Sequence, residues 1–281
     1  MSKLSANSSL PRPTVTVAII ALDEESHLSE LLPRLTWADE VVVVDGGSRD
    51  RSAEVARSYG AQVVERRFDR FAEQRNAALD AARSDWVFFI DADERPTPRL
   101  VAELRQRITE ESASGYRVPI RSTIFGRRFR FSGTQNDIPL RLMRRGSGRW
   151  GGAVHERFAL TGGVGLLTAH LEHFTLPSVA AFRRKMQRYT SLEAEARLAR
   201  GEAPRRRDLW LRPVLEVFRR LLWKHGWLDG PEGWRFCLLS GLSEWALARK
   251  HRDGWRRLHA AQSPCAATTP SRAPLLSGEA A

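Results

Sequence analysis

Short apolar runs alternate with segments of helical periodicity through the first third of the chain. Residues 15–22 (VTVAIIAL) form a continuous β-branched apolar run, which is typical of a strand buried on both faces of a parallel sheet. Residues 24–35 follow with apolar positions three and four apart, which predicts a helix. The alternation continues with predicted strands at 40–44, 62–64 and 86–90 and predicted helices at 51–59 and 71–82. This order predicts βαβ units, a parallel sheet and right-handed crossovers.

The pattern changes after Gly115, where the apolar runs become shorter. Short strands are predicted at 116–120, 129–131 and 171–174, with a mixed apolar and basic segment at 135–145. From about residue 179 the periodicity is helical, and six of the nine tryptophans lie between Trp210 and Trp255. The predicted organisation is a disordered N-terminus at 1–13, an α/β domain at 14–178, a basic Trp-rich helical region at 179–261 and a disordered tail at 262–281.

Length and composition exclude several classes of protein. The 281 residues, 42% of them hydrophobic, suffice for one large α/β domain with a helical extension. This composition excludes a disordered, a collagen-like or a disulfide-stapled chain. Cys237 and Cys265 lack the neighbouring His or Cys residues that a zinc module needs. Residues 1–13 lack the apolar run of a secretory signal, and no run of 18 uncharged residues suits a membrane span. We therefore expect a cytoplasmic protein.

The formal net charge of +12 is unevenly distributed along the chain. Residues 1–110 contain 15 Lys and Arg against 19 Asp and Glu, whereas residues 111–281 contain 30 against 14. A strongly basic second part favours a polyanionic partner, such as a phospholipid surface, a phosphorylated lipid or nucleic acid. No helix-turn-helix, zinc-finger or aromatic RNA-binding signature accompanies this charge, so nucleic acid is not the expected partner.

The most informative chemical motif is Asp91-Ala92-Asp93, which directly follows the apolar run at 86–90. Ligands of open α/β sheets bind at the carboxyl ends of the strands, and two carboxylates in a turn can hold one hard cation beside a diphosphate. Asp45 likewise ends a predicted strand and begins Asp45-Gly46-Gly47-Ser48, where a carboxylate can bind a base or ribose. Both segments also suit ordinary surface turns, with Ser48 capping the next helix.

Seven segments in a fixed order resemble the inverting glycosyltransferase family 2, whose members have the GT-A fold. The segments are 15–25 (VTVAIIALDEE), 41–52 (VVVVDGGSRDRS), 73–82 (EQRNAALDAA), 86–94 (WVFFIDADE), 115–119 (GYRVP), 141–145 (RLMRR) and 154–158 (VHERF). The chain is most similar to the bacterial branch that contains lipopolysaccharide-core β-1,4-glucosyltransferases. The resemblance implies an α/β fold with a Rossmann-like, mainly parallel sheet flanked by helices and a basic helical C-terminal extension. It also implies a nucleotide-binding half at 14–110 and an acceptor half at 111–178.

The resemblance assigns nucleotide-sugar binding to residues near the strand ends. Asp91 and Asp93, with Ala92 between them, match the motif that binds the metal and the diphosphate, and Asp45 matches a position that commonly binds uracil or ribose. The other positions expected to line the nucleotide pocket are Leu22, Asp23, Glu24, Arg75 and Asn76. Many relatives carry Asn where this chain has Asp23, so the role of this position is open.

Inverting transfer needs a base that takes a proton from the acceptor hydroxyl, and Asp137 and Glu156 are the two candidates. His155 is a candidate metal ligand or diphosphate contact. A cluster of arginines is expected to bind phosphate or the acceptor, since guanidinium groups pair with phosphate in a bidentate manner. The cluster consists of Arg141, Arg144 and Arg145, and an exposed charged strand edge is its alternative interpretation.

Residues 214–224 (VLEVFRRLLWK) have the pattern of an amphipathic helix with a cationic rim, which is typical of an interfacial membrane anchor. Trp223 and Trp227, four positions apart, suit the depth of lipid headgroups. The alternative is that these apolar residues pack the helix onto the catalytic domain.

The sequence thus predicts an inverting glycosyltransferase that depends on Mg²⁺ or Mn²⁺ and uses a nucleotide-diphosphate sugar, with UDP-glucose as the first candidate. The expected acceptor is a hydroxyl of a lipopolysaccharide core or another surface glycan, and the expected location is the cytoplasmic face of the inner membrane, peripherally on its anionic surface. A sugar-nucleotide-forming nucleotidyltransferase is the enzyme alternative, although Asp23-Glu24-Glu25 stands where such an enzyme carries a Gly-rich basic loop. A non-catalytic basic module that binds membranes or nucleic acid is the second alternative.

Overall fold

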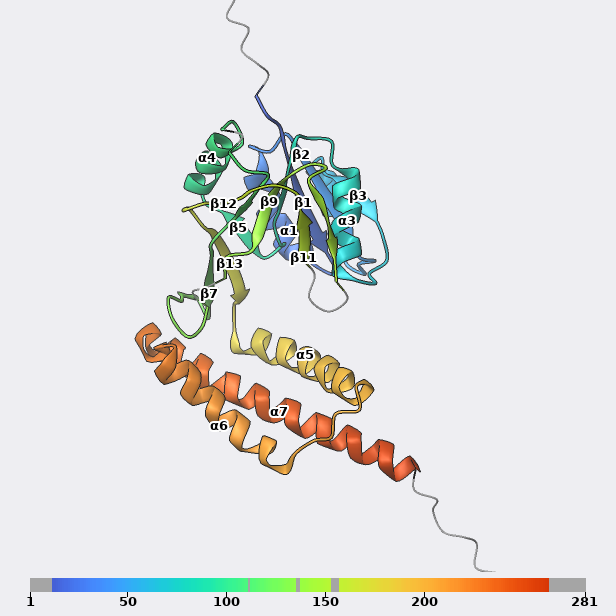
Figure 1. The fold of residues 1–281 in the computed structure, drawn as a ribbon, viewed down its shortest axis with the longest axis vertical. Coiled ribbons are helices and arrows are strands. Elements are labelled where there is room, and N and C mark those ends of the chain that lie inside the picture. Colours follow the sequence, from blue (N-terminus) through green and yellow to red (C-terminus); the bar gives the residue numbers. More distant parts are fainter. Residues whose placement is uncertain (1–11, 111, 135–136, 153–156, 263–281) are drawn as a thin grey trace, which may run out of the picture.

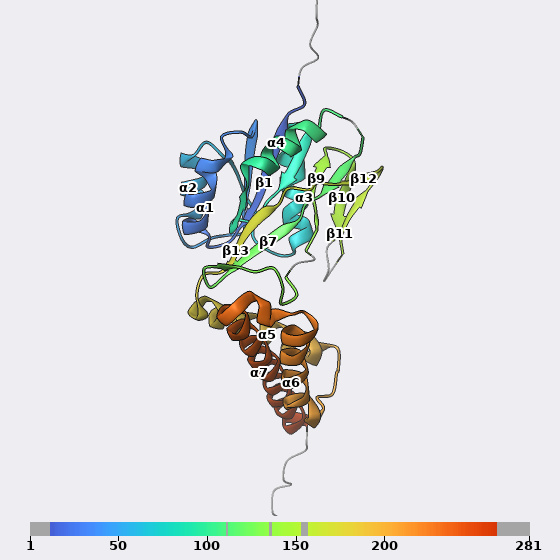
Figure 2. The same ribbon diagram turned by 90° about the vertical axis from the view of Figure 1, so that its left-hand side faces the viewer.

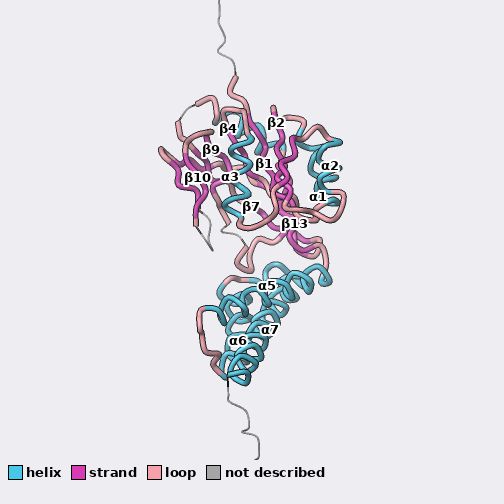
Figure 3. Tube along the Cα trace, turned by 90° about the vertical axis from the view of Figure 1, so that its right-hand side faces the viewer, coloured by secondary structure: helices cyan, strands magenta, loops and turns pink. Residues whose placement is uncertain are grey.

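The computed structural model describes residues 12–110, 112–134, 137–152 and 157–262. These residues form a sheet lobe (12–178) and a helical lobe (179–262), which are joined end to end (Figure 1). Figure 3 shows the strands gathered in the sheet lobe, and the described part of the helical lobe consists of helices and loops. The segments predicted to be disordered, 1–13 and 262–281, lie almost entirely outside the described residues.

A seven-stranded sheet forms the centre of the sheet lobe. β1 pairs in parallel with β2 and β4, β2 with β3, and β6 with β12, whereas β9 runs antiparallel between β4 and β6. In spatial order the strands are β12 (Val164–Leu166), β6 (Gly115–Arg117), β9 (Leu140–Arg144), β4 (Trp86–Phe89), β1 (Val15–Ala21), β2 (Glu40–Asp45) and β3 (Gln62–Glu65). The fold class predicted from the sequence, a mainly parallel sheet flanked by helices with a helical C-terminal extension, is confirmed.

Helices cover both faces of this sheet, which explains why the strands read as continuous apolar runs. Val17 and Ile19 of β1 pack in a core with Leu28 and Leu100, whereas Ala18 points into a second core with Leu79. The first core is covered by α1 (Glu25–Leu31), the 3-10 turn η1 (Leu32–Leu35), α2 (Ser52–Ser58) and α4 (Pro98–Arg107), and the second by α3 (Phe71–Ala81). Sequence analysis did not predict α4, although Thr97 caps it by accepting a hydrogen bond from the Leu100 N–H at 3.2 Å.

Smaller strands extend the sheet lobe toward the helical lobe. A four-stranded sheet contains β5 (Glu94–Pro96), β13 (Leu171–Leu176), β7 (Ile120–Ile124) and β8 (Arg127–Arg128), and β10 (Gly148–Gly151) pairs with β11 (Arg157–Leu160). Two predictions were wrong here. The strand expected at 116–120 divides between β6 and β7, because Pro119 has no N–H to continue the ladder of the central sheet. The strand expected at 129–131 is a loop, and β8 precedes it.

The helical lobe consists mainly of three helices. They are α5 (Val179–Ala199), α6 (Leu211–Phe218) and α7 (Gly230–Gln262), with the 3-10 turns η2 (Arg206–Leu209) and η4 (Gly226–Asp229) and the π-helical turn η3 (Arg219–Trp223). The long helix α7 packs against both α5 and α6. Figures 1 and 2 show α5 nearest to the sheet lobe and α6 farther away. Within the described residues, no helix has both the length and the apolar character needed to cross a bilayer.

The two lobes are joined by a small core and by one buried carboxylate. Ile124, Leu176, Phe182 and Phe236, together with Phe129, form an apolar cluster across the joint.

The buried carboxylate belongs to Asp229, which ends η4. It accepts hydrogen bonds from the Arg130 N–H at 2.8 Å, the Phe131 N–H at 3.2 Å and the Ser132 hydroxyl at 2.7 Å. Arg220 also donates to the Ser132 carbonyl at 2.8 Å. The loop after β8 is therefore fixed to the helical lobe by a set of buried polar contacts, which together with the apolar cluster hold the lobes in one arrangement.

Candidate active site

The acidic residues predicted to bind the nucleotide sugar lie along the edge of the central sheet that is formed by the carboxyl ends of its parallel strands. β1 lies between β2 and β4 and is parallel to both, so their carboxyl ends meet. Asp23 and Asp91 follow β1 and β4, and Asp45 is the last residue of β2. This edge faces the helical lobe in Figures 1 and 2. The site is thus positioned by the sheet and bordered by α5.

Asp91 is held ionised by arginine. Its carboxylate accepts a hydrogen bond from Arg141 at 2.8 Å, and Arg75 lies 3.9 Å from its other oxygen. Enclosure by the protein opposes ionisation, but the charge and hydrogen bond of Arg141, with the charges of Arg75 and His173, lower the pKa of Asp91 to about 2. Because 43% of its side chain is still exposed, this carboxylate can contact a ligand.

Glu94 is a fully buried carboxyl group that sequence analysis missed. It accepts hydrogen bonds from Arg141 at 2.6 Å and from the Asp91 N–H at 2.9 Å. Burial raises the pKa of Glu94 to about 7, with Arg141 opposing this shift and Asp91 adding to it. One buried arginine therefore serves two carboxyl groups, and its own pKa is raised by both of them despite the cost of burial. Glu94 and Arg141 fix the turn that carries Asp91.

Asp93 forms a pair with His173 of β13. His173 was not among the residues predicted to form the site. The Nε2 atom of His173 lies 3.1 Å from the Asp93 Oδ2 atom. Burial opposes charge on both groups, but their mutual hydrogen bond and attraction lower the pKa of Asp93 and raise that of His173. Lys185 of α5 also lowers the pKa of Asp93, so the helical lobe contributes positive charge to the site.

The donor set at Asp93 fits a divalent cation. Carboxylate oxygen and imidazole nitrogen are ligands of Mn²⁺ and related ions, and Mg²⁺ commonly binds through one or two carboxylates and substrate phosphates. Among the described residues, no three His, Cys, Asp or Glu side chains form a complete metal-binding group. Asp93 and His173, with Asp91 nearby, are therefore suited to a cation that receives its other ligands from a diphosphate.

The residues that follow β1 and β2 form a hydrogen-bonded pair of turns. Asp45 is buried and accepts hydrogen bonds from the Ser48 hydroxyl at 2.5 Å and from the N–H groups of Gly47 and Ser48 at 3.1 Å. Asp23 has a left-handed φ of 58° and accepts from the Arg49 N–H at 2.7 Å. The structure thus brings Asp23 and Asp45 together, while their contacts are those of the local turns. Their role in binding the nucleotide stays a prediction.

The other residues assigned to the nucleotide pocket have different surroundings. Glu24 contacts His27 at 2.5 Å, Leu22 is half-buried, and Ala92 is buried, with its carbonyl accepting from Arg95 at 2.7 Å. Arg75 stacks on the ring of Trp150, 4.5 Å from its centroid, and reaches toward Asp91.

Asn76 and the arginines after Arg141 do not reach Asp91. The amide of Asn76 exchanges two hydrogen bonds of 3.0 Å with the backbone of Trp150. Because β9 is antiparallel to β4, Arg144 lies opposite Trp86 and Arg145 donates to the Ser84 carbonyl at 2.8 Å, at the opposite edge of the sheet. The predicted phosphate cluster therefore contributes only Arg141 to this site, and the expected roles of the other two remain predictions.

The two candidate bases are placed unequally. Asp137 is exposed on the loop before β9, and its charge helps to raise the pKa of Arg141, so it lies close to the carboxylate cluster. Glu156 and the candidate ligand His155 lie outside the described residues. The choice of base stays open.

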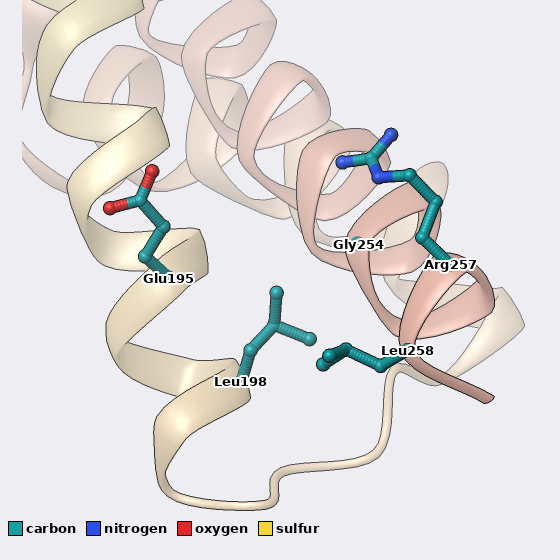
Figure 4. Close-up of a pocket in the computed structure, with 5 residues that line it drawn as sticks. All are labelled: Glu195, Leu198, Gly254, Arg257 and Leu258. Carbon is teal, nitrogen blue, oxygen red and sulfur yellow. The ribbon is translucent and has the colours of Figure 1, made fainter. Parts of the chain in front are cut away.

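A separate pocket lies in the helical lobe, between the end of α5 and the last turns of α7 (Figure 4). It is lined by Glu195, Leu198, Gly254, Arg257 and Leu258. Leu198 packs so closely that a Cβ atom at Gly254 would lie 2.5 Å from its Cδ1 atom. These residues explain the close contact of α5 and α7 and have no connection to the carboxylate cluster.

Comparisons with known proteins agree with the resemblance found in the sequence. The chain is 32% identical over 248 residues to the lipopolysaccharide core biosynthesis glycosyltransferase LpsC of Rhizobium meliloti, covering 84% of this chain and 87% of that protein. It is 38% identical over 122 residues to the undecaprenyl-phosphate 4-deoxy-4-formamido-L-arabinose transferase of Pseudomonas aeruginosa, covering 38% of this chain and 35% of that one.

Solved structures give weaker matches. S. aureus TarS in complex with UDP-GlcNAc matches with a TM-score of 0.44 at 14% identity, over 87% of this chain and 92% of that chain. Glucosyl-3-phosphoglycerate synthase from Mycobacterium tuberculosis, in complex with Mn²⁺ and UDP, matches with a TM-score of 0.32 at 28% identity, over 40% and 44% of the two chains.

The family model described as glycosyl transferase family 2 matches residues 16–186, more than half of the chain. This match covers every strand-end residue of the carboxylate cluster and His173. It also removes the support for a nucleotidyltransferase and for a non-catalytic binding module. The chain therefore belongs to glycosyl transferase family 2 and is a nucleotide-sugar-dependent glycosyltransferase.

Proposed function

We propose that the protein is an inverting, metal-dependent transferase that moves a sugar from a UDP-sugar, with UDP-glucose as the first candidate, onto a hydroxyl of a lipopolysaccharide core or another surface glycan. The observation that carries this proposal is the arrangement of Asp91 and Asp93 at the carboxyl end of β4, each within hydrogen-bond distance of a basic side chain. Both acids stay ionised at neutral pH, which a site for a divalent cation and a diphosphate requires.

Asp93 and His173 are the residues that would hold the cation, Mg²⁺ or Mn²⁺, with Asp91 beside them. When bound, the cation would stabilise negative charge on the departing diphosphate. Arg75 and Arg141 add two positive charges near Asp91 and keep the carboxylate cluster from repelling an anionic donor.

In inverting transfer, the acceptor oxygen forms a bond to the anomeric carbon as the bond from that carbon to the diphosphate oxygen breaks. The proton of the acceptor hydroxyl must go to a base near the site. Asp137 and Glu156 remain the two candidates. Asp137 is supported by its exposure and by its electrostatic influence on Arg141.

The names of the relatives support the proposed acceptor and location. LpsC is named for the lipopolysaccharide core, and the Pseudomonas protein is named for undecaprenyl phosphate. With a lipid-linked or lipopolysaccharide-core acceptor, the enzyme would act at an anionic membrane surface, bound peripherally to the cytoplasmic face of the inner membrane. The basic charge of the second part of the chain supports this location.

The first test is thermal stabilisation of the purified protein by UDP, GDP or dTDP, each with and without Mn²⁺. A ligand that binds only the folded state stabilises it by about 2.7 kcal/mol at a hundredfold excess over its Kd. We expect UDP with Mn²⁺ to raise the melting temperature more than UDP alone or either other nucleotide with Mn²⁺. Equal stabilisation by UDP with and without Mn²⁺ would contradict the proposed role of the metal. Stabilisation by GDP or dTDP but not by UDP would contradict a UDP-sugar as the donor.

A further inference from the structure

Large apolar side chains of α6, η3 and α7 are exposed on the helical lobe. Phe218 is 58% exposed and Trp223 is 80% exposed. Val214, Leu222, Leu238, Leu242 and Trp245 are exposed as well. Single exposed apolar residues are ordinary, but a group this large on neighbouring helices indicates a surface that is covered in use.

Five of these side chains line one surface, because α6 lies close against α7. A shallow groove between the two helices is lined by Pro213, Val214, Val217, Phe218, Leu238, Gly241, Leu242 and Trp245. Gly241 permits the close approach, since a Cβ atom there would lie 2.5 Å from the Val217 Cγ2 atom. We call the exposed members of this set the apolar face: Val214, Phe218, Leu238, Leu242 and Trp245.

Exposed arginines accompany the apolar face on α6, η3 and α7. They are Arg212, Arg219, Arg235 and Arg249. Each has an acidic partner that is more shielded than itself: Arg219 is 52% exposed, for example, whereas Glu216 is only 15% exposed. Arg249 also lies over the ring of Trp245, 5.3 Å from its centroid. The whole helical lobe contains 19 Lys and Arg against 9 Asp and Glu.

We propose that the apolar face and the accompanying arginines dock the protein on an anionic bilayer surface. Apolar side chains flanked by cations bind at the boundary between headgroups and acyl chains, and the arginines add attraction to anionic lipids. The inference deepens the proposed function, since it rests on an acceptor carried by a membrane and names the residues that reach that membrane.

The excess of basic residues over the whole helical lobe favours lipid over a second copy of this chain. A symmetric dimer would place the same patch of each copy against the other, which would bring two strongly basic lobes together. Anionic headgroups would instead neutralise the lobe. The position of the face also fits, because α6 lies farther from the sheet lobe than α5 does (Figure 2).

The test measures sedimentation of the full chain with vesicles of phosphatidylglycerol and phosphatidylcholine, or of phosphatidylcholine alone, without donor or acceptor. We expect binding to the anionic vesicles only, and weaker binding as salt is raised. The double substitution Phe218→Ser with Trp245→Ser should weaken binding by about tenfold or more, because two anchoring side chains are removed. The matched control is Tyr59→Ser, which removes an equally exposed ring from the sheet lobe and should not change binding.

Three results would overturn the proposal: absent or charge-independent binding of the wild type, unchanged binding of the double variant, or a wild-type dimer that the double variant dissociates, which would show that a second copy covers the face. Quenching of tryptophan fluorescence by spin-labelled lipid in the wild type gives a second readout that needs no variant. The double variant should keep the Mn²⁺-dependent stabilisation by UDP, so a failure of vesicle binding is distinguishable from a failure of the proposed function.

Discussion

The two lobes use charge and apolar surface in opposite ways. In the sheet lobe, the charged groups of the active site are paired, as buried Arg141 is with Asp91 and Glu94, and most apolar residues of the strands are enclosed by the two cores. In the helical lobe, large apolar side chains such as Phe218 are exposed and the accompanying arginines are exposed as well. The difference teaches that the sheet lobe suits a small polar ligand. The helical lobe instead presents an apolar surface that, as proposed above, another molecular surface covers.

The largest effect is expected where a buried charge loses its partner. Arg141→Ala leaves Asp91 and Glu94 without the cation that compensates them, and breaking a buried ion pair in this way costs about 3–5 kcal/mol. Urea denaturation measures the loss. Arg149→Ala, which breaks the exposed pair with Asp80, is the matched control and should cost about 0–1 kcal/mol. Equal losses of unfolding free energy in the two variants would show that the buried cluster stabilises the fold no more than an exposed ion pair does.

The next effect concerns chemistry more than folding. Asp93→Asn removes a carboxylate charge that a cation needs, and we expect transfer to fall by about a hundredfold or more, equivalent to roughly 3 kcal/mol of transition-state stabilisation. The melting temperature without ligand should fall, because His173 loses its charged partner, and the Mn²⁺-dependent stabilisation by UDP should be lost altogether. Asp80→Asn provides the control carboxylate on the same lobe. Normal Mn²⁺-dependent stabilisation of Asp93→Asn would remove Asp93 from the metal site.

The joint between the lobes tests whether they act as one unit. Asp229→Asn keeps the shape of the side chain but removes the charge that three donors of the loop after β8 share, which we expect to cost about 1–3 kcal/mol. Calorimetry should then show a broader transition, because the lobes are less tightly coupled. Asp253→Asn, which changes a partly exposed residue of α7, should leave the transition unchanged. A sharp, unshifted transition in Asp229→Asn would show that the apolar cluster alone joins the lobes.

The smallest effect is a pH dependence within the sheet lobe. Burial opposes ionisation of Glu103, but hydrogen bonds from the Ala169 and Thr168 N–H groups and the Thr168 hydroxyl outweigh it and lower its pKa. The stability that the ionised group contributes is therefore present above its unfolded pKa of about 4.5 and is lost as the pH falls through the lower folded value. Melting curves from pH 7 to pH 3 should show the gap between wild type and Glu103→Gln shrinking below pH 4.5. A constant gap would contradict this assignment.

The first half of the fold could be predicted from sequence because three of its four main strands, β1, β2 and β4, are largely buried on both faces. β1, β2, β3 and β4 each begin at the predicted residue and end within one residue of the predicted end, since a continuous apolar run marks a strand between two helical layers. The strands after residue 115 are short and lie in three different sheets, so their apolar runs say little about which sheet they join. Pro119 was the available signal for the break between β6 and β7.

The site was only partly predictable. The Asp91-Ala92-Asp93 motif could be recognised from neighbouring residues alone. Glu94 and His173 could not, because each depends on a partner that is distant in the chain: Arg141 for Glu94 and Asp93 for His173. A carboxylate directly after the motif and a histidine within the apolar stretch at 171–174 were the signals that could have indicated them. The three arginines at 141–145 looked equivalent in sequence, and only the antiparallel direction of β9 separates Arg141 from the others.

The buried carboxylate of Asp229 has a consequence for the choice of acceptor. Because it fixes the loop after β8 to the helical lobe, the distance from the apolar face to the carboxylate cluster is a property of the fold. A protein docked through that face would hold its catalytic edge at a constant height above the lipid. Under the proposed docking, a hydroxyl would reach the site only where the sugars beneath it raise it to that height.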